Sequence, residues 1–485
     1  GVIWVGTNDG LVQVTRDGGK TWTNVTANIP NLPAWGTIYS IEASRHSTGT
    51  AYIAVDLHQE NNRDPFVYRT SDYGKTWKSL AATLPSGPLG YAHCIAEDPV
   101  RPGMLFLGTE NAIYVSFDAG DEWQSLQNNL PHAPVYGITV QEHFCDLVIA
   151  TYGRGFWILD DMTPLRQMTP AILSASAHLF TPRPAYRFRG ITPPAAPSYD
   201  PVAGENPPYG ADLNYYLKSA PDGDVRITIL DDQGRPVRTL PGTKHAGINR
   251  VWWDLTDGPG PPIRVRTAPM YAPWVRVGPE GRALGGRSTL LAPPGRYAVK
   301  LSVGGQELTQ PLTLIKDPHS AGTEADIRAQ VALLLAIRGS QATVGDMINQ
   351  VEMVRKQLGD LGSVLQGADA AVVKTAAGEL DRKLIDLEEN LFQIRVSGGQ
   401  DGMRWPAKLL EKLRHLASGV QQSDFAPTAQ QIAVHQQFAE QIKDLRARYE
   451  QLLSSDIAGF NAMLREKGIP NIVVTRLSTK QRSAQ

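Results

Sequence analysis

Alternating hydrophobic and polar positions dominate the first 160 residues of the chain. Apolar stretches with the strand period of two, at residues 3–7, 51–55, 104–109 and 147–151, are separated by turn-forming residues. A strand, turn, strand, loop, strand order recurs about every 50 residues, which is the spacing and strand content of propeller blades. The pattern predicts about four four-stranded blades within residues 1–180.

An eight-residue motif, Ser/Thr-x-Asp-x-Gly-x-x-Trp, ends three of these repeats. Its aspartate can accept hydrogen bonds from the backbone of its own turn, and its glycine can supply a positive φ. Its tryptophan can fill the space between neighbouring sheets. We therefore interpret the motif as a structural staple. Its members are Asp17, Gly19 and Trp22, then Asp72, Gly74 and Trp77, then Asp118, Gly120 and Trp123.

The motif is the Asp-box, and the chain resembles Asp-box proteins such as sialidases, xyloglucan-hydrolysing glucanases and sortilin-type receptors. Residues 147–160, with the following Met162-Thr163-Pro164-Leu165, are similar to bacterial sortilin-like or glycosyl-hydrolase-like BNR-repeat proteins. That resemblance implies a propeller, a sandwich, a helical tail and an extracytoplasmic location, periplasmic or secreted. Four blades are too few for such a ring, so we expect an N-terminal portion or another chain to supply the rest.

Loops on the side opposite to the Asp-boxes gather polar and aromatic residues at one predicted opening. A carboxylate pair about 5–10 Å apart could hydrolyse a glycosidic bond, and rings between blades could stack on a peptide or glycan. Sialidase chemistry is disfavoured because Arg63 and Arg154 are the only arginines on these loops. The catalytic candidates, if the protein is an enzyme, are Asp9, Asp56, Asp64 and Glu110. The ligand-binding candidates are Trp35, His58, Tyr91, Tyr136, Tyr152 and Arg154.

A Pro-rich stretch at residues 181–208 predicts a stiff linker between two units. Residues 209–318 then predict a β-sandwich, and Trp252-Trp253-Asp254 is among the segments that resemble the Ig-like module of flagellar hook-capping proteins. An insertion at residues 256–291 is rich in arginine and aromatic residues, as interface centres are. We expect the insertion to contact the propeller or a partner chain. The interface candidates are Arg264, Arg266, Tyr271 and Trp274.

Residues 319–485 have the helical period of 3.6 instead of the strand period. Thr323 and Thr428 begin two helices with capping boxes, and apolar residues from Val434 to Leu452 recur at steps of three or four. The pattern predicts a bundle of about four helices, with a surplus face that could support a homo-oligomer. The fold class is therefore a multidomain β plus α protein: a partial Asp-box propeller, an Ig-like sandwich and a helical bundle.

Composition narrows the range of functions. The 47 basic and 48 acidic side chains give a net charge of -1, which disfavours nucleic acid as a partner. No run of 18 apolar residues predicts a membrane span. His58, Glu60 and Asp64 match no standard ligand spacing, so no metal is expected. No Gly-rich phosphate loop appears in the sequence, and no cofactor is expected. The two cysteines, Cys94 and Cys145, leave the redox compartment open.

The preferred function at this stage is an exported, non-catalytic binding or scaffolding protein whose propeller face recognises a protein, peptide or glycan. The first alternative is a propeller glycoside hydrolase that acts on polysaccharide through a carboxylate pair. The second alternative is a structural subunit of a larger assembly. A carboxylate pair at the opening would favour the enzyme.

Overall fold

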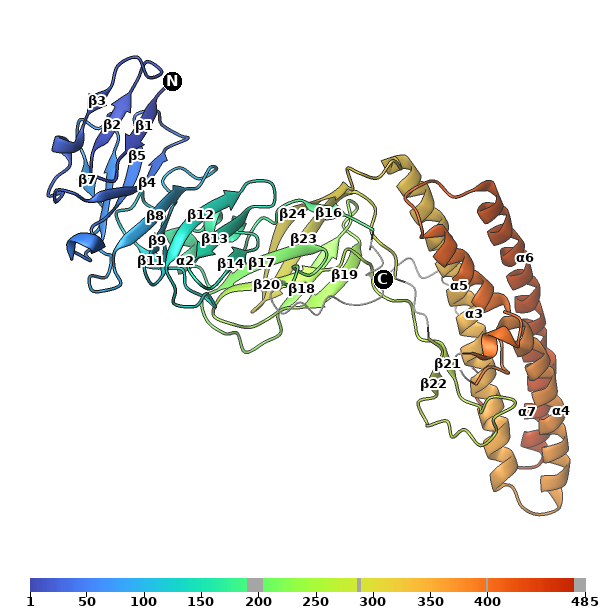
Figure 1. Cartoon of the computed structure of the whole chain (residues 1–485). Helices are drawn as coiled ribbons and strands as arrows, with labels where there is room; N and C mark the ends of the chain where they lie inside the picture. Colours follow the sequence, from blue (N-terminus) through green and yellow to red (C-terminus); the bar gives the residue numbers. More distant parts are fainter. Residues whose placement is uncertain (190–203, 286–288, 398–399, 475–485) are drawn as a thin grey trace.

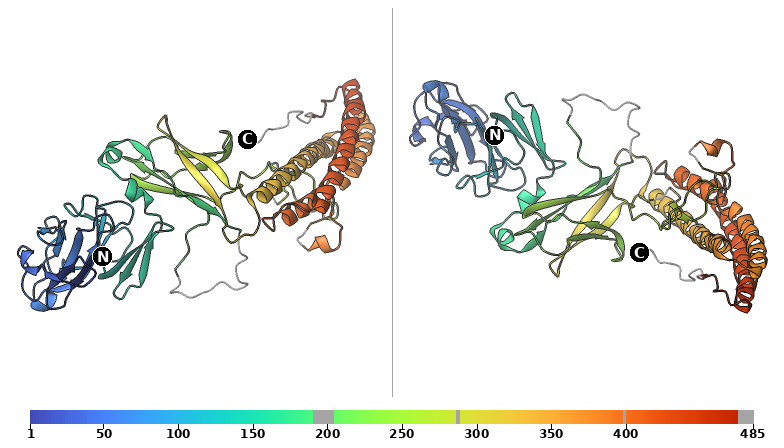
Figure 2. Two further views of the ribbon diagram at one scale, coloured as in Figure 1. Left: turned by 90° about the horizontal axis from the view of Figure 1, so that it is seen from above. Right: turned by 90° about the horizontal axis from the view of Figure 1, so that it is seen from below.

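The computed structural model describes residues 1–189, 204–285, 289–397 and 400–474. Small antiparallel sheets come first, a unit of two sheets follows, and long helices end the chain, so that the molecule is elongated (Figures 1 and 2). It is thus a β-rich, multidomain protein with a helical C-terminal part. Of the predicted Pro-rich linker, residues 190–203 lie outside the described residues.

Four antiparallel sheets make up the Asp-box region, residues 1–160. The first sheet consists of β1 (Ile3–Gly6), β2 (Val12–Thr15) and β3 (Thr23–Asn24), and the second of β4 (Thr37–Ala43), β5 (Ala51–Asp56), β6 (Phe66–Thr70) and β7 (Lys78–Ser79). The third consists of β8 (Ala92–Glu97), β9 (Leu105–Thr109), β10 (Ile113–Ser116) and β11 (Gln124–Ser125). The fourth consists of β12 (Val135–Gln141), β13 (Asp146–Thr151) and β14 (Phe156–Leu159). Three separate clusters of buried apolar side chains fill the spaces between successive sheets. The sheets therefore pack face to face, as strands with apolar residues on both faces require.

Each Asp-box connects the third strand of its repeat to the short outer strand. The Asp17 carboxylate accepts the backbone N–H of Thr21 at 2.9 Å and the hydroxyl of Thr15 at 2.8 Å. These bonds, the Thr21 backbone bond above all, lower the pKa of Asp17 to about 2. Equivalent bonds surround Asp72 and Asp118. The carboxylates are thus occupied by their own turns.

The glycine and tryptophan of the second and third Asp-boxes face the preceding sheet. Gly74 and Gly120 have φ of 79° and 91°, and a Cβ there would meet Val25 and Leu80 at less than 3 Å. Trp77 is 8% exposed and Trp123 is 7% exposed. Trp22 is 42% exposed, because no described residue forms a sheet on its side. For Trp22, the expected role of filling a gap between sheets is therefore not met within the described residues.

Two sheets form the sandwich around a core that includes Trp253 and Tyr215. One sheet has the order β15 (Ala177–Leu179), β17 (Ala211–Leu217) and β20 (Gly247–Trp253). The other has the order β16 (Ala185–Arg187), β24 (Gln306–Lys316), β23 (Gly295–Val303), β18 (Arg226–Leu230) and β19 (Pro236–Pro241). The predicted domain bounds placed the residues of β15 in the propeller unit and those of β16 in the linker. Both are sandwich strands, and their three-residue length is too short for alternation to reveal them.

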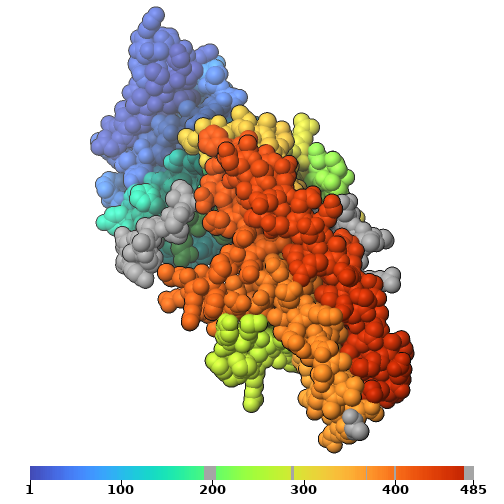
Figure 3. Space-filling model, turned by 90° about the vertical axis from the view of Figure 1, so that its right-hand side faces the viewer, coloured from blue at the N-terminus to red at the C-terminus, as the bar shows by residue number. Residues whose placement is uncertain are grey.

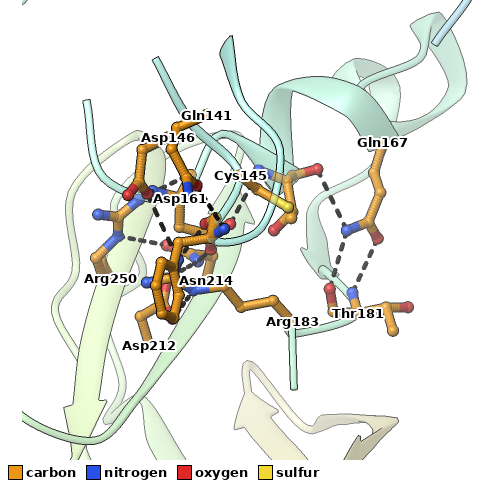
Figure 4. A network of polar contacts seen from close by, with 12 residues as sticks. Gln141, Cys145, Asp146, Asp161, Gln167, Thr181, Arg183, Asp212, Asn214 and Arg250 are labelled. Carbon is orange, nitrogen blue, oxygen red and sulfur yellow. Dashed lines mark hydrogen bonds and ion pairs between the residues drawn. The ribbon is translucent and has the colours of Figure 1, made fainter. Parts of the chain in front are cut away.

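Two short helices, α1 (Thr163–Gln167) and α2 (Pro170–Ser174), follow the Asp-box region in the chain. A buried polar network joins the Asp-box region to the sandwich (Figure 4). The amide of Asn214 donates to Asp161 at 2.9 Å and to Asp212 at 3.3 Å. Arg183 donates to Asp212 at 3.1 Å, and Arg250 donates to the Asn214 side chain at 2.8 Å. Burial, together with the hydrogen bond and charge of Asp212, raises the pKa of Asp161 to about 7. The two carboxyl groups therefore share one proton near neutral pH.

The helical part consists of α3 (Glu324–Val364), α4 (Ala368–Leu391), α5 (Leu409–Val420) and α6 (Ala429–Gln451), followed by a π-helical turn, Leu452–Ile457, and α7 (Ala458–Glu466). One apolar core runs through these helices.

The helix α3 is long and apolar enough to cross a membrane, but the core helix of a soluble protein has the same length and composition. Its residues Ile337, Val344 and Val351 are buried in the apolar core of the helices. Cys94 and Cys145 are both free thiols.

The Arg-rich insertion packs on these helices and not on the propeller, which was the first of the two contacts expected of it (Figures 1 and 3). The second, a contact with a partner chain, stays a prediction. Its hairpin, β21 (Arg264–Val265) with β22 (Arg282–Ala283), lies against α3, where the Glu352 carboxylate accepts the backbone N–H groups of Arg266 and Thr267. Tyr271 stacks on Trp405 with ring centroids 5.6 Å apart. Trp274 contributes little to this contact, since it is 77% exposed. The buried Glu352 carboxylate holds the insertion on α3, and a contact between residues so far apart in the sequence cannot be predicted from a local pattern.

Candidate functional site

Six rings from three successive sheets meet at the strand ends opposite the Asp-boxes. This ring cluster consists of Tyr39, His58, Tyr91, His93, Tyr136 and Tyr152. His93 lies at its centre, stacked on Tyr136 with centroids 4.2 Å apart and edge-on to Tyr39 and Tyr91 at 5.4 and 5.1 Å. His58 extends the cluster by stacking on Tyr91 at 5.1 Å, and Tyr152 extends it beyond Tyr136 at 5.8 Å.

Three of these rings project from β-bulges at equivalent positions. The pairing of β4 with β5 skips Tyr39, that of β8 with β9 skips His93, and that of β12 with β13 skips Tyr136. A bulge inserts one residue without a partner and redirects its side chain, and bulges are frequent next to active sites. The same backbone irregularity therefore aims one ring per sheet into a common cluster.

Two carboxylates from neighbouring sheets border the ring cluster. Glu110 follows β9, and its carboxylate lies 2.8 Å from Nε2 of His93. Asp56 ends β5, and its carboxylate accepts the backbone N–H of His58 at 2.9 Å and contacts Nδ1 of the same ring at 2.7 Å. Asp56 is buried, whereas Glu110 keeps part of its side chain exposed. Both carboxylates are thus held in place by donors within the cluster.

The tyrosine hydroxyls report the negative potential of the cluster. Burial raises the pKa of Tyr91, and a hydrogen bond to Glu110 and the charges of Glu110 and Asp56 raise it further. Burial and the charge of Glu110 also raise the pKa of Tyr136, with a further contribution from Asp56. Because both carboxylates act on the same two tyrosines, they belong to one electrostatic site.

The other candidates from the sequence lie outside this cluster. The Asp9 carboxylate accepts the hydroxyl of Thr7 within its own turn and is exposed. Asp64 is exposed on the loop before β6. Trp35 is 69% exposed, and the Arg154 guanidinium donates to the carbonyl of the adjacent Gly153. Of the catalytic candidates, only Asp56 and Glu110 therefore meet at the rings.

Tyr39 and His93 are the members that sequence reasoning missed. Both lie inside strands, β4 and β8, where an apolar or aromatic residue is expected to be core. Their equivalence with Tyr136, two or three residues into the first strand of each sheet, was the available signal. Among the described residues, no three His, Cys, Asp or Glu side chains are grouped as a metal ion would need.

The chain is similar in sequence to part of a glycan-degrading enzyme. An oligoxyloglucan-reducing end-specific xyloglucanase of Emericella nidulans is 28% identical over 125 residues, which is 24% of this chain and 14% of that protein. The chain thus spans a small part of that relative. No protein-family model matches the chain.

Among solved structures, the GH74 xyloglucanase from Xanthomonas campestris aligns with 68% of this chain and 46% of its own, at 15% identity and a TM-score of 0.26. An ancestral GH74 enzyme aligns with 65% of this chain and 55% of its own, at 11% identity and a TM-score of 0.22. Alignments at these scores do not by themselves establish a shared fold.

The sequence likeness to a xyloglucanase corrects one expectation. The prediction of a non-catalytic binding or scaffolding protein is wrong on this finding, and the glycoside hydrolase alternative fits it better. The reason lies in the carboxylates. From the sequence they look like solvated loop residues, whereas the structure places Asp56 and Glu110 in one cluster of rings.

Proposed function

We propose that the chain is part of a glycoside hydrolase that acts on a polysaccharide at the ring cluster. The observation that carries the proposal is the convergence of Asp56 and Glu110, from adjacent sheets, on the same two tyrosines, with each carboxylate held by its own histidine. Glycosidases need two carboxyl groups, one to protonate the leaving oxygen and one to act as base or nucleophile. The likeness to a named xyloglucanase supports the same reaction class.

The rings supply a reason for the polysaccharide substrate. Tyr152 is 75% exposed beside the more buried Tyr136, so its ring can lie against the apolar face of a sugar while the inner rings hold the carboxylates. No arginine belongs to the ring cluster, and the negative charges of Asp56 and Glu110 would repel the carboxylate of an acidic sugar. A neutral glycan fits these charges best.

The architecture belongs to the same proposal. We infer that the four Asp-box sheets are consecutive blades of a propeller, completed by an N-terminal portion or by another chain, and that the protein acts outside the cytoplasm. The face-to-face packing of the sheets and the Asp-box staples support the first inference. The resemblance to exported BNR-repeat proteins supports the second.

The test is an activity assay of the protein as it occurs, together with any portion that completes it. The purified protein is incubated with xyloglucan, mixed-linkage β-glucan and cellulose oligosaccharides, and released reducing ends are measured. We expect D56N and E110Q each to lower kcat by about 100-fold or more, because each removes one carboxyl group from the pair. D64N, which alters an exposed carboxylate outside the cluster, is the matched control. Hydrolysis that survives both cluster substitutions would overturn the assignment.

A further inference from the structure

His93 occupies the interior of the ring cluster. Its side chain is 1% exposed, with Tyr136 against one face and the edges of Tyr39 and Tyr91 around it. A residue enclosed in this way cannot touch a polymeric substrate. Whatever His93 contributes must therefore act through a neighbour, and its one hydrogen-bond partner among the described residues is Glu110, at 2.8 Å.

The two ring nitrogens of His93 have different surroundings. Nε2 faces the Glu110 carboxylate, whereas Nδ1 is buried and has no hydrogen-bond partner among the described residues. A proton on Nδ1 would bury a donor without an acceptor, while a bare Nδ1 leaves only a lone pair unmatched. The favoured tautomer therefore carries its proton on Nε2 and donates it to Glu110.

Glu110 is fixed from two further directions. Its backbone N–H donates to the carbonyl of Tyr91 at 3.1 Å, which ties the loop after β9 to the residue before β8. Besides burial, the Glu110 carboxylate raises the pKa of the Tyr91 hydroxyl, so the two groups interact. With the Nε2–H of His93 aimed at it, the Glu110 carboxyl group is an acceptor in this geometry.

We propose that His93 is a positioning residue that holds Glu110 as an oriented carboxylate, so that Glu110 is the base or nucleophile of the pair and not the acid. This assignment rests on the proposed glycosidase function. The titratable groups around His93 are Tyr39 from β4, Tyr91 from the loop before β8, Glu110 from the loop after β9 and Tyr136 from β12, with Asp56 and His58 behind Tyr91. No lysine or arginine is among these neighbours, so the Nε2–H of His93 is the nitrogen donor on which the Glu110 carboxylate depends.

The kinetic test compares H93F, which keeps a flat ring and loses the donor, with H93Q, which keeps an amide donor. In H93F we expect kcat to fall at least about 10-fold with KM nearly unchanged, because the Glu110 carboxylate loses the donor that orients it. H93Q should restore much of kcat. H46F is the matched control, since the ring of His46 makes one hydrogen bond, to the Asp98 carbonyl, on the Asp-box side. An H93F variant with unchanged kcat, or an H93Q variant as slow as H93F, would overturn the proposal.

A second measurement separates this proposal from the proposed function. Nitrogen-15 NMR of the histidine-labelled full chain should show the His93 proton on Nε2, and E110Q should change that signal. If the wild-type chain hydrolyses no glycan but shows this signal and this response, the glycosidase assignment fails while the His93–Glu110 pair stands. A proton on Nδ1, or a signal that ignores E110Q, refutes the pair whatever the activity.

Discussion

The shared proton between Asp161 and Asp212 predicts that D161N makes the junction between the Asp-box region and the sandwich insensitive to pH. The pKa of Asp161 is raised from 3.8 to about 7, so the folded state binds the proton more tightly than the unfolded state does. The contribution of this group to stability is therefore complete below its unfolded pKa and is lost as the pH rises from about 4 to 7.

The size of the effect follows from the shift. A rise of about three pKa units corresponds to about 4 kcal/mol, at about 1.4 kcal/mol per unit. The pKa of Asp212 is lowered, so the stability that this partner contributes is lost only as the pH falls below about 4, outside this range. Asparagine cannot titrate, but it can donate to Asp212 as the protonated acid does. It also tolerates the φ of 50° at this position.

Stability is measured by urea denaturation between pH 4.5 and 8.5, with separate probes because several units can unfold in turn. We expect the wild type to lose about 2–4 kcal/mol over this range in the transition that reports the junction, and D161N to lose much less. D222N, which changes an exposed carboxylate of the sandwich, should follow the wild type. Parallel pH dependences for wild type and D161N would refute the shared proton.

Three further predictions concern Asp118, Glu352 and the two cysteines. D118A should destabilise the Asp-box region by about 1–2 kcal/mol, since it removes the acceptor of the Glu122 N–H and the Ser116 hydroxyl, and a lower thermal transition measures this. E352A removes the acceptor of Arg266 and Thr267 and should detach the insertion from α3, at a cost of about 3 kcal/mol or more. Hydrogen exchange at residues 264–270 should become faster, and unchanged exchange there would contradict this prediction. Iodoacetamide should label Cys145 before Cys94 in the native protein, because burial raises the pKa of the Cys94 thiol to about 12, and peptide mass spectrometry reads the order.

The periodicity of the chain predicted much of the secondary structure, because strands and helices depend on short-range patterns. The Asp-box turns were equally predictable, since Asp17 and Thr21 interact within five residues. The site was only partly predictable. Asp56 and Glu110 were among the candidates, but the bulges at Tyr39 and His93 depend on the pairing of each strand with its neighbour, which alternation does not encode.

The insertion between β20 and β23 has a consequence for how the chain acquires its structure. Val265 and Leu290 lie in the apolar core of the helices, while the bridge between Thr256 and Leu291 anchors both ends of the insertion to the sandwich. During synthesis these residues leave the ribosome before α3, α4 and α5, so they cannot be buried until the helices have been made. The sandwich would carry an unburied hairpin for that interval, and such surfaces promote misassembly. A truncation at the boundary after residue 318 would make that state permanent, which argues for producing the two units together.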